Sequence, residues 1–150
     1  MDLGIVFKIC NYTALAGWLL LAVAPRWKGT QYIVHTAAVP LLLAVAYLYF
    51  IVTGFGGEGE GGFGSLEGVM ALFTQPRAVL AGWIHYLVFD LFIGAWEVRD
   101  AQRLRISHWL LLPCLFFTLM LGPVGLLLYF TLRWTLRREF IINEGAPSAS

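Results

Sequence analysis

The sequence has 150 residues, enough for one compact domain and too few for two. Apolar residues make up 59% of it and charged residues 13%, against roughly 45–50% and about 25% in soluble domains. A soluble protein of this size could not bury so much apolar surface, and the formal net charge of +1 with no basic run between aromatics excludes a nucleic-acid partner. We therefore predict a single transmembrane domain over residues 1-150, surrounded by the lipid bilayer.

Four apolar stretches are close to the roughly 20 residues that a helix needs to cross the hydrocarbon core. They are Gly4–Ala24, Tyr32–Thr53, Val79–Trp96 and His108–Leu132. Within lipid, backbone polar groups must be paired inside the segment, so we predict an all-α bundle of about four transmembrane helices. Pro40, Pro113 and Pro123 fall inside these stretches, and each predicts a kink or a local opening because proline removes one helical hydrogen bond.

The remaining segments are predicted to be connectors. Residues 54-64 are rich in glycine and indicate a flexible loop. Ser65 can cap a short amphipathic helix, ended by Pro76, that lies at the membrane interface between the second and third spans. The mixed charges from Glu97 to Arg105 are typical of a solvated connector, and residues 139-150 are predicted to be a polar tail.

The two cysteines, Cys10 and Cys114, lie in apolar stretches with no CxxC pattern and no histidine at ligand spacing. We interpret them as small apolar side chains rather than as a disulfide or metal site. The first apolar stretch is interpreted as a retained helix rather than a cleaved signal, because Asp2 stands where a basic region is expected and Pro25 would follow the cleavage site.

The distribution of basic residues does not predict which way a bundle of four spans is oriented in the membrane. In that topology both termini and the second loop share one side of the membrane, with five basic residues on each side. One side has Lys8, Arg77, Arg133, Arg137 and Arg138, and the other has Arg26, Lys28, Arg99, Arg103 and Arg105. The positive-inside rule then favours neither orientation.

Chemistry is most strongly indicated in the third span, which contains His85 and Asp90. An ionisable residue at this depth is costly, so it is expected to face the bundle interior and to have a function. At about 100° per residue, Asp90 shares a helix face with Trp83, Tyr86, Gly94 and Glu97, whereas His85 lies about 140° away. The two side chains therefore border one cavity from two sides, or each meets a different helix.

A structural role for Asp90 remains an alternative. Its carboxyl would then accept hydrogen bonds from another span and hold the bundle together. The candidate donors are Asn11, Tyr12, His35 and Thr36.

Several pieces of the sequence together resemble the abscisic-acid-deficient 4-like family. They are Ser65–Val69, Phe73, Pro76, Ala81–Gly94, Asp100–Gln102, Pro113–Cys114 and Gly122–Gly125. The family includes the plant membrane protein needed to make neoxanthin from violaxanthin. Plant members carry a plastid transit peptide that we do not find here, so the resemblance implies an integral protein of a bacterial or cyanobacterial membrane.

The resemblance implies isomerisation of a carotenoid end group, from a 5,6-epoxide to an allenic alcohol, with no cofactor and no metal. One acid must give a proton to the epoxide oxygen and one base must take a proton from the polyene. Asp90, neutral in an apolar site, is the predicted acid, His85 the predicted base, and Glu67 a substitute if its helix folds over the bundle. The predicted ligand-binding residues are Trp83, Tyr86, Phe89, Gly94, Asn11 and His35.

Two other functions are compatible with the same residues. The first is a non-catalytic protein that binds a carotenoid or another lipid, or that assists a partner carotenoid enzyme. The second is a small proton-linked carrier that uses Asp90. The expected partners are the bilayer, an apolar polyene or carotenoid ligand, and either a second copy of the chain in a homo-oligomer or a partner carotenoid enzyme.

Overall fold

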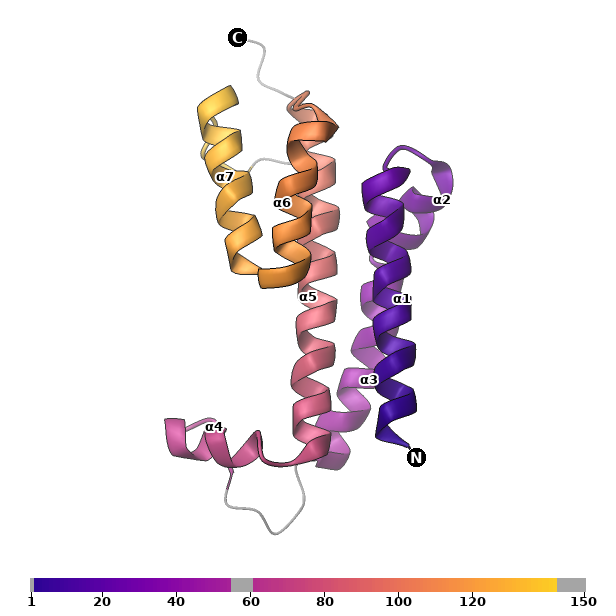
Figure 1. Cartoon of the computed structure of the whole chain (residues 1–150), viewed down its shortest axis with the longest axis vertical. Helices are drawn as coiled ribbons and strands as arrows, with labels where there is room; N and C mark the ends of the chain where they lie inside the picture. Colours follow the sequence, from indigo (N-terminus) through magenta and orange to yellow (C-terminus); the bar gives the residue numbers. More distant parts are fainter. Residues whose placement is uncertain (1, 55–60, 143–150) are drawn as a thin grey trace.

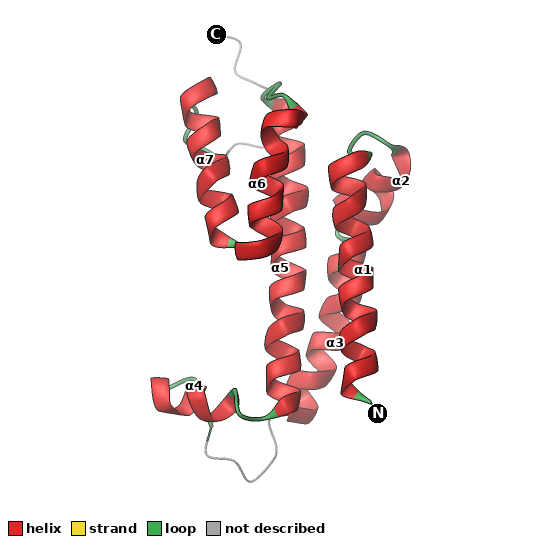
Figure 2. Cartoon of the chain, in the orientation of Figure 1, coloured by secondary structure: helices red, strands yellow, loops and turns green. Residues whose placement is uncertain are grey.

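The computed structural model describes residues 2–54 and 61–142, and these residues form helices and no strand (Figure 2). The all-α prediction is confirmed. The elements are α1 (Leu3–Val23), α2 (Lys28–Thr30), the π-helix η1 (Gln31–His35), α3 (Ala38–Gly54), α4 (Leu66–Leu72), α5 (Pro76–Arg103), α6 (His108–Leu121) and α7 (Pro123–Arg137). The long helix α5 packs against α1 and α3 on one side and against α6 and α7 on the other (Figure 1).

Three segments are long and apolar enough to cross a membrane: Leu3–Val23, Lys28–Gly54 and Pro76–Arg103. They cover the first three predicted spans except for Ala24, which follows the end of α1. Many of their apolar side chains are exposed, including Val23 (81%), Val45 (67%) and Val52 (68%). Such a surface is costly in water but matches acyl chains, which indicates an integral membrane protein.

The second of these segments is interrupted just before Pro40, in agreement with the local opening that this proline predicts. The π-helix η1 ends at His35, and Ala37 has a φ of 61°. The helix restarts at Ala38, so Pro40 falls in the first turn of α3, where its missing N–H leaves no helical bond unmade.

The prediction of a fourth continuous span is wrong. The apolar run reverses at Gly122, which has a φ of 45°, and Pro123 is the first residue of α7. At 1.5 Å per residue α6 and α7 are each only about 21–23 Å long, less than the roughly 30 Å of a hydrocarbon core. They form a hairpin that descends beside α5 and returns to the same end of the bundle (Figure 1). Proline and glycine cause this reversal: glycine tolerates positive φ, and proline suits a first helical position.

The predicted solvated connector from Glu97 to Arg105 is also wrong for most of its length. Helix α5 continues to Arg103, and Glu97 and Asp100 are buried against the hairpin. Their side chains find partners there, since Thr118 Oγ1 donates to the Glu97 carboxyl at 3.0 Å and Tyr129 Oη donates to Asp100 Oδ2 at 2.7 Å. The hairpin thus supplies the hydrogen bonds that water would supply in a loop.

Arg133 fastens the hairpin and the chain that follows it. Its guanidinium is fully buried, and Nε donates to Asp100 Oδ2 at 2.8 Å. The two other nitrogens donate to the carbonyl oxygens of Glu139 (2.8 Å) and Ile141 (2.7 Å). The predicted polar tail 139-150 therefore begins as a segment held on the bundle, and its residues 143–150 lie outside the described part.

The segment between the second and third spans is only partly described, because residues 55–60 of the predicted loop 54-64 lie outside the described residues. Gly54 is the last residue of α3. The predicted cap is confirmed: Ser65 Oγ accepts from the Gly68 N–H at 3.1 Å, and α4 follows. Helix α4 ends at Leu72, four residues before the predicted end at Pro76, and Pro76 is the first residue of α5. Helix α4 lies across the end of the bundle and projects to one side (Figure 1).

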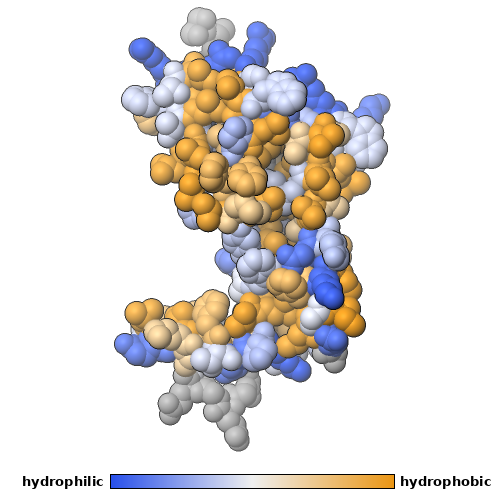
Figure 3. Space-filling model, viewed as in Figure 1, coloured by the Kyte–Doolittle hydropathy of each residue, from blue (hydrophilic) through white to orange (hydrophobic). Residues whose placement is uncertain are grey.

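The side of the molecule below the hairpin is hollow. In the space-filling view the surface recedes between the α6–α7 hairpin and α4, with hydrophobic surface above and below the hollow and more polar surface at its back (Figure 3). The hollow follows from the reversal at Gly122, because a full fourth span would fill it. It leaves the middle of α5 exposed on this side.

Candidate functional site

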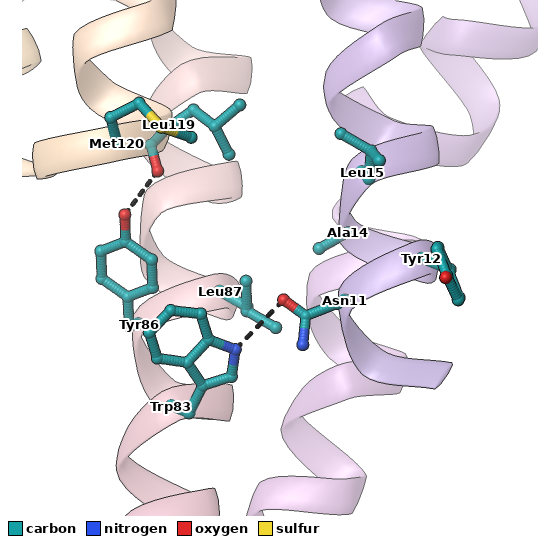
Figure 4. Close-up of a pocket in the computed structure, with 9 residues that line it drawn as sticks. All are labelled: Asn11, Tyr12, Ala14, Leu15, Trp83, Tyr86, Leu87, Leu119 and Met120. Atoms are coloured by element: carbon teal, nitrogen blue, oxygen red, sulfur yellow. Dashed lines mark hydrogen bonds between the residues drawn. The ribbon is translucent and has the colours of Figure 1, made fainter. Parts of the chain in front are cut away.

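A pocket of about 310 Å³ lies under the tip of the hairpin, between α1 and α5. Its walls come from three helices (Figure 4). They are Asn11, Tyr12, Ala14 and Leu15 of α1, Trp83, Tyr86 and Leu87 of α5, and Leu119 and Met120 of α6. Because Tyr12 is 70% exposed and Trp83 40% exposed, the pocket opens at the surface, toward acyl chains in a membrane.

Two hydrogen bonds tie the three helices together around this pocket. Trp83 Nε1 donates to Asn11 Oδ1 at 3.2 Å, joining α5 to α1 (Figure 4). The Tyr86 hydroxyl donates to the Leu119 carbonyl, joining α5 to the last turn of α6. Asn11 is thus satisfied by Trp83 and by its own helix, through Phe7, and it is not a donor to Asp90.

Asp90 lies one turn beyond Tyr86 on the same face of α5, at the turn of the hairpin. A Cβ added to Gly122 would be 2.9 Å from Asp90 Oδ1. Among the described residues, the buried Oδ2 of Asp90 has no hydrogen-bond partner. Within residues 2–54 and 61–142 the Asp90 carboxyl forms no ion pair, and an ionisable residue in mid-span without such a partner is a candidate functional residue.

Replacing Gly122 with alanine tests how closely the turn fits this carboxyl. Alanine at positive φ costs about 1–2 kcal/mol, and its methyl group would also push Asp90 Oδ1 aside. We expect Gly122→Ala to lower the unfolding midpoint in detergent by several degrees. Gly64→Ala is the control, because a Cβ there meets nothing within 4 Å; equal midpoints for both variants would contradict the geometry at Gly122.

His85 and Asp90 are not brought together. His85 lines a second pocket of about 210 Å³ with residues of α3, α4 and α5, among them Tyr47, Leu72 and Gly82. Its ring packs on Phe89 (4.6 Å between centroids) and Tyr47 (5.6 Å). Of the two arrangements that helical geometry allowed, the structure has the one in which each side chain meets a different helix. Phe89 lies with His85, away from the pocket under the hairpin.

Three other predicted site residues also lie elsewhere. Glu67 is exposed in the first turn of α4, at the far end of the bundle (Figure 1). Gly94 packs against α1, where an added Cβ would be 2.5 Å from the Trp18 ring. The backbone of His35 accepts a hydrogen bond from Arg99 Nη1 at 3.1 Å, near the other end of α5. Asn11, Trp83 and Tyr86 are the predicted ligand-binding residues that the pocket brings together.

Sequence reasoning missed Leu119, Met120 and Gly122, which belong to the hairpin tip. A signal was present in Gly122-Pro123, the pair of residues that ends one helix and starts another. Cys10 and Cys114 are buried and unpaired, in agreement with their interpretation as apolar side chains.

Comparison with known proteins places the chain in a family. Residues 5–129 match the ABA DEFICIENT 4-like family. The Arabidopsis thaliana protein ABA DEFICIENT 4, chloroplastic, is 24% identical over 144 residues, covering 90% of this chain and 63% of that protein. The chain therefore spans less than two thirds of the length of this relative. No solved structure matches the chain. Because the family match covers most of the sequence, this protein belongs to the ABA DEFICIENT 4-like family.

Proposed function

We propose that the protein is a membrane isomerase that converts a carotenoid 5,6-epoxide end group into an allenic alcohol, with Asp90 as its catalytic carboxyl. The observation that supports the proposal is the buried Oδ2 of Asp90, which has no partner among the described residues. Asp90 lies one turn of α5 beyond Tyr86, a residue that lines the apolar pocket, although Asp90 itself is not part of the lining. The family supports the substrate class.

The reaction balances without an added reactant. The neutral Asp90 carboxyl gives its proton to the epoxide oxygen, and the bond between that oxygen and the carbon next to the polyene breaks. The carboxylate oxygen then takes the proton of the adjacent polyene carbon, whose electron pair forms the new double bond of the allene. One proton is given and one is taken, so no proton is gained or lost overall, and Asp90 returns to its neutral form. The Tyr86 hydroxyl, which donates to the Leu119 carbonyl, lines the pocket one turn of α5 before this carboxyl.

The pocket suits an end group that arrives from the bilayer. Most of its lining is apolar, and its polar groups are few: the Asn11 amide, the Trp83 N–H and the Tyr12 and Tyr86 hydroxyls. This is the usual character of a small-molecule site, in which a few polar groups orient an otherwise apolar ligand. The hollow below the hairpin (Figure 3) gives the rest of the polyene a path along the side of α5.

The test is expression in a host that accumulates violaxanthin, followed by pigment analysis of the cells and of the purified protein. We expect neoxanthin with the wild-type chain and at least a hundredfold less with Asp90→Asn, since one acid or base typically contributes about 10²–10⁴-fold. Glu67→Gln is the matched control, because its carboxylate is exposed and remote, and it should convert normally. Purified Asp90→Asn should remain folded and retain pigment.

His85→Ala separates the two candidate bases. If His85 is the base, as the sequence suggested, the variant should stop conversion; its location in the other pocket favours normal conversion. Other outcomes identify the alternative functions. Pigment that copurifies but is never converted indicates a carotenoid-binding protein or an assistant to another enzyme, and pH-driven flux into liposomes without a pigment change indicates a proton-linked carrier.

A further inference from the structure

The reversal of α6 and α7 changes the distribution of charge between the two ends of the bundle. We name the end where α1, α5 and α7 finish the basic end. Eight of the ten lysines and arginines of the chain lie there, in the last turns of these helices or in the connections that follow them. They are Arg26, Lys28, Arg99, Arg103, Arg105, Arg133, Arg137 and Arg138. Lys8 and Arg77 lie toward the opposite end, near the starts of α1 and α5.

Part of this charge is used inside the protein. Arg103 and Arg133 form ion pairs with Asp100 and Glu139, and Arg99 donates to the His35 carbonyl. Five basic side chains remain exposed, and among the described residues none of them has a carboxylate within 4.0 Å. They are Arg26, Lys28, Arg105, Arg137 and Arg138. Arg137 Nη2 also donates to the Arg105 carbonyl at 2.7 Å, but this bond leaves its positive charge uncompensated and its side chain exposed. The charge of all five side chains is therefore available to an external partner.

Exposed tryptophans mark the depth of these residues in the membrane. Trp27 (57% exposed), Trp109 (81%) and Trp134 (50%) lie at the basic end, each within a few residues of an exposed basic side chain. Tryptophan prefers the boundary between acyl chains and headgroups. The five basic residues therefore lie at headgroup level, where anionic phosphates are found. The opposite end instead carries the exposed carboxylates of Asp2 and Glu67.

We propose that the basic end binds the anionic phospholipid headgroups of the cytoplasmic leaflet, and that the amino terminus and α4 lie on the other side of the membrane. Cytoplasmic connections of membrane proteins carry an excess of lysine and arginine, and anionic headgroups attract basic segments next to a span. A bundle of four spans would have divided the charges evenly. The orientation depends on the hairpin and is independent of the proposed enzymatic activity.

Labelling of single cysteines with a membrane-impermeant maleimide tests the orientation in bacterial spheroplasts. Gly64→Cys reports on the α4 side, because a Cβ there has open space. Ser107→Cys reports on the basic end, because Ser107 is exposed and its side chain makes no cap bond to α6. The native Cys10 and Cys114 are buried. We expect Gly64→Cys to label in intact spheroplasts and Ser107→Cys only after lysis; the reverse pattern, or equal labelling, would overturn the proposal.

The headgroup contact is tested by reconstitution into phosphatidylcholine vesicles with and without phosphatidylglycerol. We expect the anionic lipid to raise the unfolding midpoint of the wild-type protein. The variant R26Q/K28Q/R105Q should lose most of this rise, whereas Lys8→Gln, which removes an exposed charge at the opposite end, should keep it. A wild-type midpoint that ignores phosphatidylglycerol, or a triple variant that responds as strongly as the wild type, would refute the proposed binding surface.

Discussion

Replacing Gly125 with alanine is expected to separate α6 from α7 and to unfold the hairpin. A Cβ at Gly125 would lie 2.0 Å from the Thr118 backbone nitrogen and 2.4 Å from its Cα. These are backbone atoms of the facing helix, which cannot turn away as a side chain can. Overpacking typically costs about 1–3 kcal/mol, and the rigidity of this contact places Gly125→Ala at about 3 kcal/mol or above.

The measurement is the thermal unfolding midpoint of the purified protein in detergent, with the monodisperse yield as a second readout. Gly62→Ala is the control, because a Cβ there has no neighbour within 4 Å, and it should unfold like the wild type. The variant at Gly125 should also expose Thr118, whose hydroxyl holds the Glu97 carboxyl. A normal midpoint for Gly125→Ala would mean that α6 and α7 do not pack as an antiparallel hairpin.

Replacing Arg133 with methionine is the second change with a large expected effect. Removing one partner of a buried ion pair generally costs about 3–5 kcal/mol, because the other charge stays buried. Asp100 keeps Tyr129 and Arg103 as partners, so we expect about 3 kcal/mol. The carbonyls of Glu139 and Ile141 also lose their donor, and the carboxyl-terminal segment should detach.

Limited proteolysis with mass spectrometry distinguishes this local release from general unfolding. In Arg133→Met the segment 139–142 should be cleaved while the helices stay intact at low temperature. Arg138→Met is the control, since its exposed side chain makes no ion pair within the described residues, and it should behave like the wild type. Equal cleavage of the two variants would show that Arg133 does not hold this segment.

The limits of sequence reasoning are clearest in residues 108–132. Hydropathy detects apolar surface, and a hairpin that enters the membrane and returns has the same apolar surface as one spanning helix. The difference lies in one backbone angle, at Gly122, and in the close packing of Gly125 on Thr118. Pro113 did not help to find the reversal, because α6 continues through it whereas the chain turns at Pro123.

Helical geometry predicted which residues share a face of α5. It placed Asp90, Tyr86 and Trp83 on one face of α5 and His85 on another, and the structure agrees. It could not identify the neighbours of that face, because they come from other parts of the chain: Leu119 and Met120 of α6 line the pocket with Tyr86, and Gly122 lies against Asp90. Helix α6 covers Glu97 through Thr118, and α7 covers Asp100 through Tyr129 and Arg133, although the charges of these two residues in isolation indicate a solvated loop.

The most direct test of the proposed function uses the purified protein alone. Wild-type protein and Asp90→Asn are reconstituted into liposomes that contain violaxanthin, with no nucleotide, metal or reductant added, and the pigments are followed by chromatography. If Asp90 isomerises the end group, neoxanthin should form with the wild type and not with the folded variant. No neoxanthin from folded wild-type protein, or equal amounts from both proteins, would contradict the proposal.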